Sequence, residues 1–287
     1  MISVIINCFN GQEFLRETLE TVINQSYKDW ELIFWDNRST DLSAQIFQEY
    51  KDKRFRYFLS EKHTSLGEAR NLAAKHANGD WIAFLDCDDL WHPKKLELQI
   101  SAANSADNIG IVYSPFEILR VSDSTQALKL GSYYARMRVE PHAPKSIFSG
   151  LLEGNNIILS TALVRSTFYE KVGGIDVRLK QNEDYDLFLK VSNISLAICI
   201  SLNTVFYRIH SGNNSHSNYE LIYNENKIIF NSYLKNALIF NALKINSTRY
   251  SIYLIRSNRY FKSLKILITE GSITWLFKQL IIKLSKK

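Results

Sequence analysis

Apolar and polar residues are arranged in regular blocks along the first hundred positions. Short apolar runs occupy 2–6, 31–35, 55–59 and 81–85, and longer segments between them carry apolar residues at helical spacing. The runs predict buried strands, and the segments between them predict helices. Strands that alternate with helices in this way are typical of an α/β fold, in which right-handed connections place helices on both faces of a mostly parallel sheet.

Three local signals refine the ends of the predicted helices. Asn10 stands three residues before Glu13, which predicts a capping pair at the start of the first helix. Gly79 follows the helix predicted at 66–76 in the manner of a C-cap. Pro93 stands where the first turn of a further helix would accept it.

The alternation loosens beyond about residue 105. One more strand is predicted at 109–113, and residues 123–144 are rich in loop-forming residues. A helix over 185–191 is entered from the polar residues 182–184. From residue 217 onward the pattern is helical, with apolar and basic residues interleaved and no proline.

Polar residues follow three of the predicted strands directly, at 7–10, 36–41 and 86–89. In open α/β sheets, ligands bind beyond the carboxyl ends of the strands. The three segments are therefore the first candidates for a binding site. Asp36 ends its strand near the place to which an adjacent strand would bring Asp86, so we expect it to contact a nucleoside.

Composition indicates a globular protein without a disulfide framework. The chain has 287 residues, of which 46% are apolar and 22% charged, enough for roughly two domains with a sizeable core. Its three cysteines are far apart and match no metal-binding spacing, which favours a reducing compartment. The first residues lack the basic segment of a signal peptide. We therefore expect a cytoplasmic location.

The net charge of +6 is unevenly distributed. Residues 217–287 carry 12 Lys and Arg against three Asp and Glu, a charge of +9, so residues 1–216 sum to −3. A uniformly basic chain would have suggested a nucleic-acid partner, and this distribution argues against one. A basic tail interleaved with apolar residues instead suggests an anionic membrane surface or a protein partner.

Three carboxylates crowd into four residues at Asp86, Asp88 and Asp89. Such crowding at the end of a buried strand is costly without a cation, and Mg²⁺ and Mn²⁺ prefer oxygen ligands. The alternative is a solvated acidic turn that caps the following helix. The position at the carboxyl end of a strand favours the metal.

Several of these segments together resemble the family 2 glycosyltransferases, in the same order and spacing. The resemblance covers roughly residues 1–215 and leaves the tail outside. Its main motifs are Ile2–Asn10, Gln25-Ser-Tyr-Lys-Asp-Trp-Glu-Leu-Ile, Trp35-Asp-Asn-Arg-Ser-Thr-Asp41, Gly67-Glu-Ala-Arg-Asn71 and Gly79-Asp-Trp-Ile-Ala-Phe-Leu-Asp-Cys-Asp-Asp-Leu-Trp91. Weaker matches are Val172-Gly-Gly-Ile-Asp176, Asn182-Glu-Asp184 and Tyr207-Arg-Ile-His210.

The resemblance implies a GT-A fold and transfer of a sugar from a nucleotide donor with inversion at the anomeric carbon. Asp184 matches the catalytic base, and Glu183 beside it is expected to be a supporting residue. Asp88 matches the ligand of a divalent cation, Mn²⁺ or Mg²⁺, and His210 matches a position that reaches the metal or the diphosphate in some members. The residues assigned to binding of the sugar donor are Asn7, Phe9, Asp36, Asn37, Arg70, Asp86 and Cys87.

This chain departs from the family pattern at three positions. Asn37 stands where many members have a second Asp that reads the base, although its amide still offers a hydrogen-bond donor and an acceptor to a pyrimidine. Asn7 replaces a common Pro or Thr, and Arg38 replaces a usual Gly. A UDP-sugar remains the favoured donor.

The resemblance divides the chain into three parts. We expect a nucleotide-sugar-binding half at 1–105, an acceptor-binding and catalytic half at 106–216, and a basic amphipathic tail at 217–287. The acceptor would be a glycan or a lipid-linked glycan in surface polysaccharide synthesis. One alternative is a catalytically inactive GT-A module that binds nucleotide-sugars or glycans. Another is a phosphatase with an Asp-x-Asp nucleophile, which matches less well because the first strand ends in Asn7.

The tail permits two interpretations. No run in it reaches the roughly 20 uncharged residues that span a bilayer. Its helices either pack on the catalytic core or on a second copy of the chain, or they lie on an anionic membrane. Trp275, Phe277 and the lysines around them suit a membrane interface.

Overall fold

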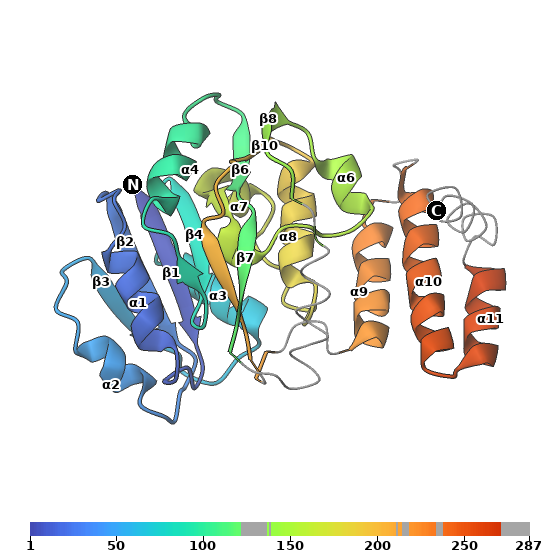
Figure 1. Ribbon diagram of the computed structural model, residues 1–287, viewed down its shortest axis with the longest axis horizontal. Helices are drawn as coiled ribbons and strands as arrows, with labels where there is room; N and C mark the ends of the chain where they lie inside the picture. Colours follow the sequence, from blue (N-terminus) through green and yellow to red (C-terminus); the bar gives the residue numbers. More distant parts are fainter. Residues whose placement is uncertain (122–136, 138, 211, 214–217, 234–237, 271–287) are drawn as a thin grey trace. The chain divides into compact units, whose positions relative to one another are not determined.

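The computed structural model describes residues 1–121, 137, 139–210, 212–213, 218–233 and 238–270 (Figure 1). The chain forms two compact units, one of Met1–Phe148 with Asn156–Asn213 and one of Ser149–Asn155 with Asn214–Lys287. Most of the predicted loop-rich stretch, and Trp275 and Phe277 of the tail, lie outside the described residues.

The first unit is built on an eight-stranded sheet (Figure 1). Its strands are β1 (Ile2–Cys8), β2 (Trp30–Asp36), β3 (Phe55–Leu59), β4 (Trp81–Asp86), β6 (Ile109–Tyr113), β8 (His142–Lys145), β9 (Leu163–Arg165) and β10 (Leu196–Cys199). In space they follow the order β3-β2-β1-β4-β9-β6-β10-β8. The first four are parallel, β9 is antiparallel to both β4 and β6, and β8 is antiparallel to β10. The strands predicted from the first four apolar runs and from 109–113 are confirmed.

Helices cover both faces of this sheet (Figure 1). They are α1 (Leu15–Ile23), α2 (Ser43–Gln48), α3 (Leu66–Ala74), α4 (Lys95–Ala103), α7 (Ser166–Lys171) and α8 (Glu183–Ser192), with a short 3-10 helix η1 (Leu159–Thr161). The chain proceeds outward from β1 to β2 and β3, and then returns to place β4 on the other side of β1. Because such connections are right-handed, α1 and α2 cover one face and α3 covers the other. The predicted α/β class is confirmed.

The core of this unit follows from the two-residue period of its strands. Val4 and Ile6 of β1 point to the face covered by α1, where they join Leu15 and Leu19 in one buried cluster. Ile5 between them is also fully buried, on the opposite face. A strand that is apolar on both sides belongs in the middle of a parallel sheet with two helical layers.

A second, smaller sheet lies over the end of β4. It contains β5 (Leu90–Trp91), β7 (Phe116–Arg120) and β11 (Val205–Ile209), in the order β5-β11-β7. The antiparallel pairing of Trp91 with Val205 brings the end of β11 back toward the acidic residues that precede β5. Segments about 120 residues apart in the sequence therefore meet at one place.

The second unit is helical. It contains most of α6 (Phe148–Leu152), together with α9 (Tyr219–Asn231), α10 (Leu238–Arg256) and α11 (Tyr260–Thr269). Tyr223, Tyr250, Leu254 and Ile266 form its buried cluster. In the described part of the chain, no helix is long and apolar enough to cross a membrane.

None of the three predicted helix ends is where the pattern placed it. Pro93 lies before α4, whose N-cap is Lys94. Asn10 has a left-handed φ of 56°, and its side chain accepts a hydrogen bond from the Thr40 backbone N–H instead of capping α1. The C-cap of α3 is Lys75, four residues before Gly79. Gly79 instead lies against β1, where its N–H donates to Ser3 Oγ at 2.8 Å.

We expect Gly79→Ala to destabilise the first unit. A Cβ at this position would lie 2.6 Å from Ser3 N and 2.9 Å from Ile2 C, both backbone atoms that a change of rotamer cannot move. Overpacking of this kind costs about 1–3 kcal/mol. Thermal unfolding should show a lower Tm, whereas Gly150→Ala, where nothing lies within 4 Å, should leave it unchanged or slightly higher. A Gly79→Ala protein as stable as the parent would contradict this packing.

Candidate active site

The polar residues at the strand ends meet where the strand order of the main sheet reverses. β2 and β4 flank β1 on opposite sides, so the connections diverge there, and open α/β sheets bind ligands at the carboxyl edge of such a switch point. Asn7 of β1 is in register with Asp86 of β4, and Cys8 is in register with Asp36 of β2. The three segments predicted as candidates therefore lie side by side.

The three acidic residues after β4 have different partners. Asp86 accepts a hydrogen bond from Arg70, and Asp88 contacts the His210 ring. Asp89 is fully buried and accepts a hydrogen bond from the Arg208 backbone N–H at 3.0 Å. Burial, together with the charges of Asp88 and Asp86, raises the pKa of Asp89 well above its usual range. Asp89 thus holds β11 in place, while Asp86 and Asp88 remain partly exposed.

Asp88 and His210 form a pair at the end of the two sheets. His210 Nε2 lies 2.9 Å from Asp88 Oδ2, and the Gly212 N–H donates to His210 Nδ1 at 3.2 Å. In the absence of a cation this network places the ring proton on Nε2, and a cation bound at Nε2 would take the place of that proton. Arg208 Nε donates to the Asp88 carbonyl at 2.7 Å and so positions the main chain of the pair.

The Asp88–His210 pair meets the needs of a divalent cation that is shared with a phosphate ligand. The described residues contain no group of three or more His, Cys, Asp or Glu side chains that could hold a metal by themselves. Mg²⁺ bound to substrate phosphates, however, needs only one or two protein carboxylates. Asp88, with 24% of its side chain exposed, and His210, with 19%, are open enough to serve.

Arg70 connects the end of β4 with the start of α8. Its Nη2 donates to Asp86 Oδ1 at 2.7 Å, and its Nη1 donates to Glu183 Oε1 at 2.8 Å. Burial lowers the pKa of Arg70, but the negative charges of Asp86 and Glu183 raise it by more, so the net shift of the pKa is upward. The ion pair agrees with the supporting role expected of Glu183. Arg70 was predicted to touch the nucleotide. Its side chain is 5% exposed and both of its terminal nitrogens are paired with carboxylates, so little of it is open to a ligand.

Asp184 lies in the first turn of α8, beside this ion-pair cluster. Its Oδ1 accepts a hydrogen bond from the Tyr185 N–H, and part of the residue remains open to solvent. Desolvation by the surrounding protein raises the pKa of Asp184 from 3.8 to about 7, the charge of Glu183 adds to the rise, and Arg70 opposes it. A carboxyl group of this pKa exchanges protons near neutral pH, as a general base must.

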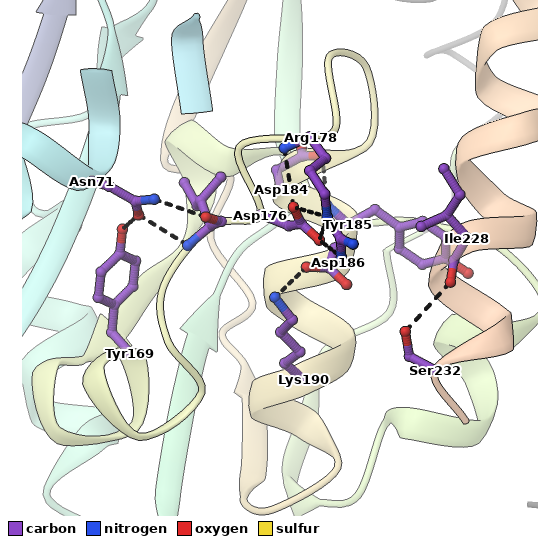
Figure 2. Close-up of polar contacts among 11 residues, drawn as sticks. Asn71, Tyr169, Asp176, Arg178, Asp184, Tyr185, Asp186, Lys190, Ile228 and Ser232 are labelled. Atoms are coloured by element: carbon purple, nitrogen blue, oxygen red, sulfur yellow. Dashed lines mark hydrogen bonds and ion pairs between the residues drawn. The ribbon is translucent and has the colours of Figure 1, made fainter. Parts of the chain in front are cut away.

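The segment before α8 is anchored to α3. Asn71 Nδ2 donates to the Ile175 carbonyl at 2.7 Å, while Asn71 Oδ1 accepts hydrogen bonds from the Ile175 N–H and the Tyr169 hydroxyl (Figure 2). Gly174, with a left-handed φ of 66°, leaves room for this contact, because a Cβ there would lie 2.7 Å from Asn71 Oδ1. Consecutive residues of α3, Arg70 and Asn71, thus hold the start of α8 in place.

The residues expected at the nucleoside are held firmly by their neighbours. Asp36 is 1% exposed, and its two oxygens accept hydrogen bonds from the Ser39 N–H and the Tyr57 hydroxyl, each at 2.7 Å. Asn37 exchanges hydrogen bonds with Thr64, donating to its carbonyl and accepting from its N–H. A direct contact between Asn37 and a base would require these bonds to open.

The other predicted sugar-donor residues have fewer hydrogen bonds to their neighbours. The Asn7 Nδ2 atom is buried without a hydrogen-bond partner among the described residues. Phe9 is 49% exposed, and its ring lies 4.3 Å from that of His63. Cys87 is partly buried, and its thiol interacts with that of Cys8. Arg38 adopts a φ of 70°, which explains why a glycine would suit that position.

The structure adds residues to the site that the sequence did not reveal. Arg208 is 3% exposed, donates to the Glu17 carboxylate and lies over the Phe14 ring. A basic residue inside the apolar run 205–209 was the available signal. Trp91, the last residue of the motif that begins at Gly79, is a core residue whose Nε1 donates to the Ser160 carbonyl.

Comparison with known proteins places these residues in a family context. Residues 3–153 match the family described as Glycosyl transferase family 2. An uncharacterized glycosyltransferase of Rickettsia typhi is 32% identical over 197 residues, which cover 68% of this chain and 59% of that protein. This chain therefore spans less than two thirds of the length of that relative.

Two further proteins are informative. The Escherichia coli enzyme UDP-Glc:alpha-D-GlcNAc-diphosphoundecaprenol beta-1,3-glucosyltransferase WfgD is 29% identical over 202 residues, 69% of this chain and 74% of the enzyme. The crystal structure of S. aureus TarS 1–349 in complex with UDP-GlcNAc superposes with a TM-score of 0.72 and 17% identity, covering 92% of this chain and 79% of that one. At this identity the likeness concerns the fold, and it confirms the predicted GT-A architecture.

Proposed function

Because the chain belongs to glycosyl transferase family 2, we propose that it transfers a sugar from a nucleoside diphosphate to a hydroxyl group of a growing surface glycan. The proposed reaction is metal-dependent and inverts the anomeric carbon. One observation carries the proposal. Asp86 and Asp88 follow β4, Asp184 lies on α8 and His210 follows β11, and contacts made by Arg70 and Arg208 link these three parts of the sequence near the carboxyl end of β4.

Asp88 and His210 are the proposed protein ligands of the cation. When bound between them and the sugar donor, Mn²⁺ or Mg²⁺ would neutralise the charge that develops on the diphosphate as the glycosidic bond breaks. Arg208 and Asp89 keep the Asp88 main chain and β11 together, so that Asp88 presents its carboxylate at a fixed place. Asp86, which is paired with Arg70, would face the ribose of the bound sugar donor.

Asp184 acts as the general base. Its carboxylate accepts the proton of the acceptor hydroxyl as that oxygen bonds to the anomeric carbon, and the bond from this carbon to the phosphate oxygen breaks with the nucleoside diphosphate as leaving group. The pKa of about 7 lets Asp184 accept the proton at neutral pH and release it after the step. Attack from the face opposite the leaving group inverts the configuration.

The substrates are proposed from the relatives together with the site. WfgD uses UDP-Glc and an acceptor linked to diphosphoundecaprenol, and TarS binds UDP-GlcNAc. We therefore favour a UDP-sugar and a lipid-linked glycan for this chain. The Phe9 ring, which is 49% exposed, offers an apolar surface to the nucleoside. Asn7 Nδ2, which is buried and has no hydrogen-bond partner among the described residues, would have to become exposed to donate to the nucleoside. Asp36 and Asn37 would shape the base pocket through the loop they hold.

A transfer assay tests the proposal. The full chain is incubated with UDP-Glc, UDP-GlcNAc, UDP-Gal or GDP-Man and a GlcNAc-diphospholipid analogue, with Mn²⁺, Mg²⁺ or EDTA. We expect release of nucleoside diphosphate that depends on both acceptor and metal, and a rise in Tm with donor and metal together. Asp88→Asn should lower turnover about 100-fold or more and abolish the metal-dependent part of the rise.

Asp107→Asn supplies the matched control. Asp107 is an exposed residue outside the site, so this variant changes the same charge and should behave as the parent. Equal turnover in EDTA and in Mn²⁺ would contradict metal dependence. Ligand-induced stabilisation without turnover on any donor would favour the inactive binding module instead.

A further inference from the structure

Among the described residues, helix α11 packs on the second unit through one face. Ile266 packs into the buried cluster with Tyr223, Tyr250 and Leu254. Ser263 and Ser251 of α10 exchange hydrogen bonds, each hydroxyl donating to the other's carbonyl. These contacts determine which side chains of α11 point away from the rest of the unit.

The outward side of α11 is apolar. It consists of Tyr260, Phe261, Leu264 and Ile268, which are 58%, 92%, 56% and 64% exposed. Residues at this spacing lie on one side of a helix, and we call them the apolar stripe. The described core of the unit does not use them. Large exposed apolar surfaces of this kind mark places of interaction.

The surface around the apolar stripe is cationic. The nearby carboxylates are already neutralised, since Glu220 pairs with Lys262 and Arg259, and Glu270 pairs with Lys227. Lys265, which is exposed on α11, makes no ion pair among the described residues, and neither does Arg256 at the end of α10.

We infer that the apolar stripe docks on an anionic phospholipid bilayer, with the surrounding Lys and Arg side chains at the lipid phosphates. An exposed apolar face bordered by basic residues is the combination that lipid surfaces attract. A second copy of this chain fits less well, because a symmetric contact would bring the cationic borders of both copies together. If the proposed function is right, the same contact would hold the enzyme where a lipid-linked acceptor lies.

Vesicle co-sedimentation of the full chain tests the inference. We expect binding to phosphatidylcholine vesicles that contain phosphatidylglycerol, weak binding to phosphatidylcholine alone, and a decrease at high salt. Phe261→Ser should lower the vesicle affinity about tenfold. Lys265→Glu should lower the vesicle affinity at low salt by a similar factor, and the remaining affinity should depend less on salt.

Matched controls separate this surface from general effects. Leu202→Ser changes an exposed apolar residue of the first unit, and Lys53→Glu changes charge by the same amount as Lys265→Glu; both should bind vesicles as the parent does. Undiminished binding of Phe261→Ser would overturn the inference. The inference would also be overturned if the parent did not bind vesicles. A dimer of the parent that Phe261→Ser dissociates, measured by light scattering, would then identify a second copy of the chain as the occupant. Transfer to a soluble acceptor, measured on the same variants, should stay unchanged and reports on the proposed function separately.

Discussion

Replacing Asp184 by Asn is expected to lower sugar transfer by about 10²–10⁴-fold while the sugar donor still binds. The amide is nearly the same size as the carboxyl group, and the hydrogen bond from the Tyr185 N–H can still be accepted by its oxygen. What the variant loses is the ability to take a proton from the acceptor hydroxyl. Turnover of the nucleotide-sugar and its binding, measured by calorimetry, should therefore separate.

The pH profile gives the same prediction a signature that a structural role would not produce. Asp184 must be ionised to act as a base, and burial raises its pKa to about 7. The value of kcat/KM should therefore rise with pH through about 7 and level off above it. Glu183→Gln removes the neighbouring charge that raises this pKa, so the rising limb should move to lower pH.

Asp107→Asn again controls for the loss of a carboxylate, and it should keep the activity and profile of the parent. The assignment of Asp184 as base fails if Asp184→Asn turns over at a normal rate. It also fails if the variant loses affinity for the sugar donor while the rate at saturation is retained, because that pattern would describe a binding residue.

The first half of the fold is predictable because its signals are local. β1, β2 and β4 are buried on both faces, so each appears in the sequence as a mostly apolar run, interrupted only by the buried Ser3 in β1 and Glu31 in β2 before the polar strand ends. β5, with two residues, and β9, with three, have no such pattern, and they exist through pairing with distant strands. Asn10 and Gly79 were misplaced for the same reason, since their partners Thr40 and Ser3 lie far away in sequence.

The candidate site, like the fold, could be predicted from the sequence only in part. Asp86, Asp88, Asp184 and His210 lie in short motifs, so the resemblance to a known family is enough to propose them as site residues. The partners of Arg70 could not be found in this way. Its contact with Glu183 joins residues separated by 113 positions, and no local pattern records such a pairing. The same holds for Arg208, whose partners lie on α1 and after β4.

Arg70→Met is expected to reduce both stability and activity. The substitution keeps much of the side-chain volume but leaves Glu183, which is 6% exposed, without its cationic partner. Glu183 Oε2 already has no hydrogen-bond partner among the described residues, so the carboxylate would be poorly compensated. Removing one member of a buried ion pair costs about 3–5 kcal/mol. The lower end of this range, about 3 kcal/mol, fits because Asp86 is partly solvated, and it corresponds to a fall in Tm of roughly 6–12 °C.

A double-mutant cycle with Glu183→Gln distinguishes the lost ion pair from lost packing. If the uncompensated carboxylate is the cause, Arg70→Met with Glu183→Gln should regain much of the lost Tm, because the neutral amide needs no cation in the interior. Activity should not return, since Asp86 and the start of α8 would still lack the guanidinium that joins them. Arg16→Met, which breaks an ion pair whose partners are 53% and 56% exposed, should change Tm little. Equal Tm losses in the single and double variants would show instead that Arg70 stabilises the unit by packing alone.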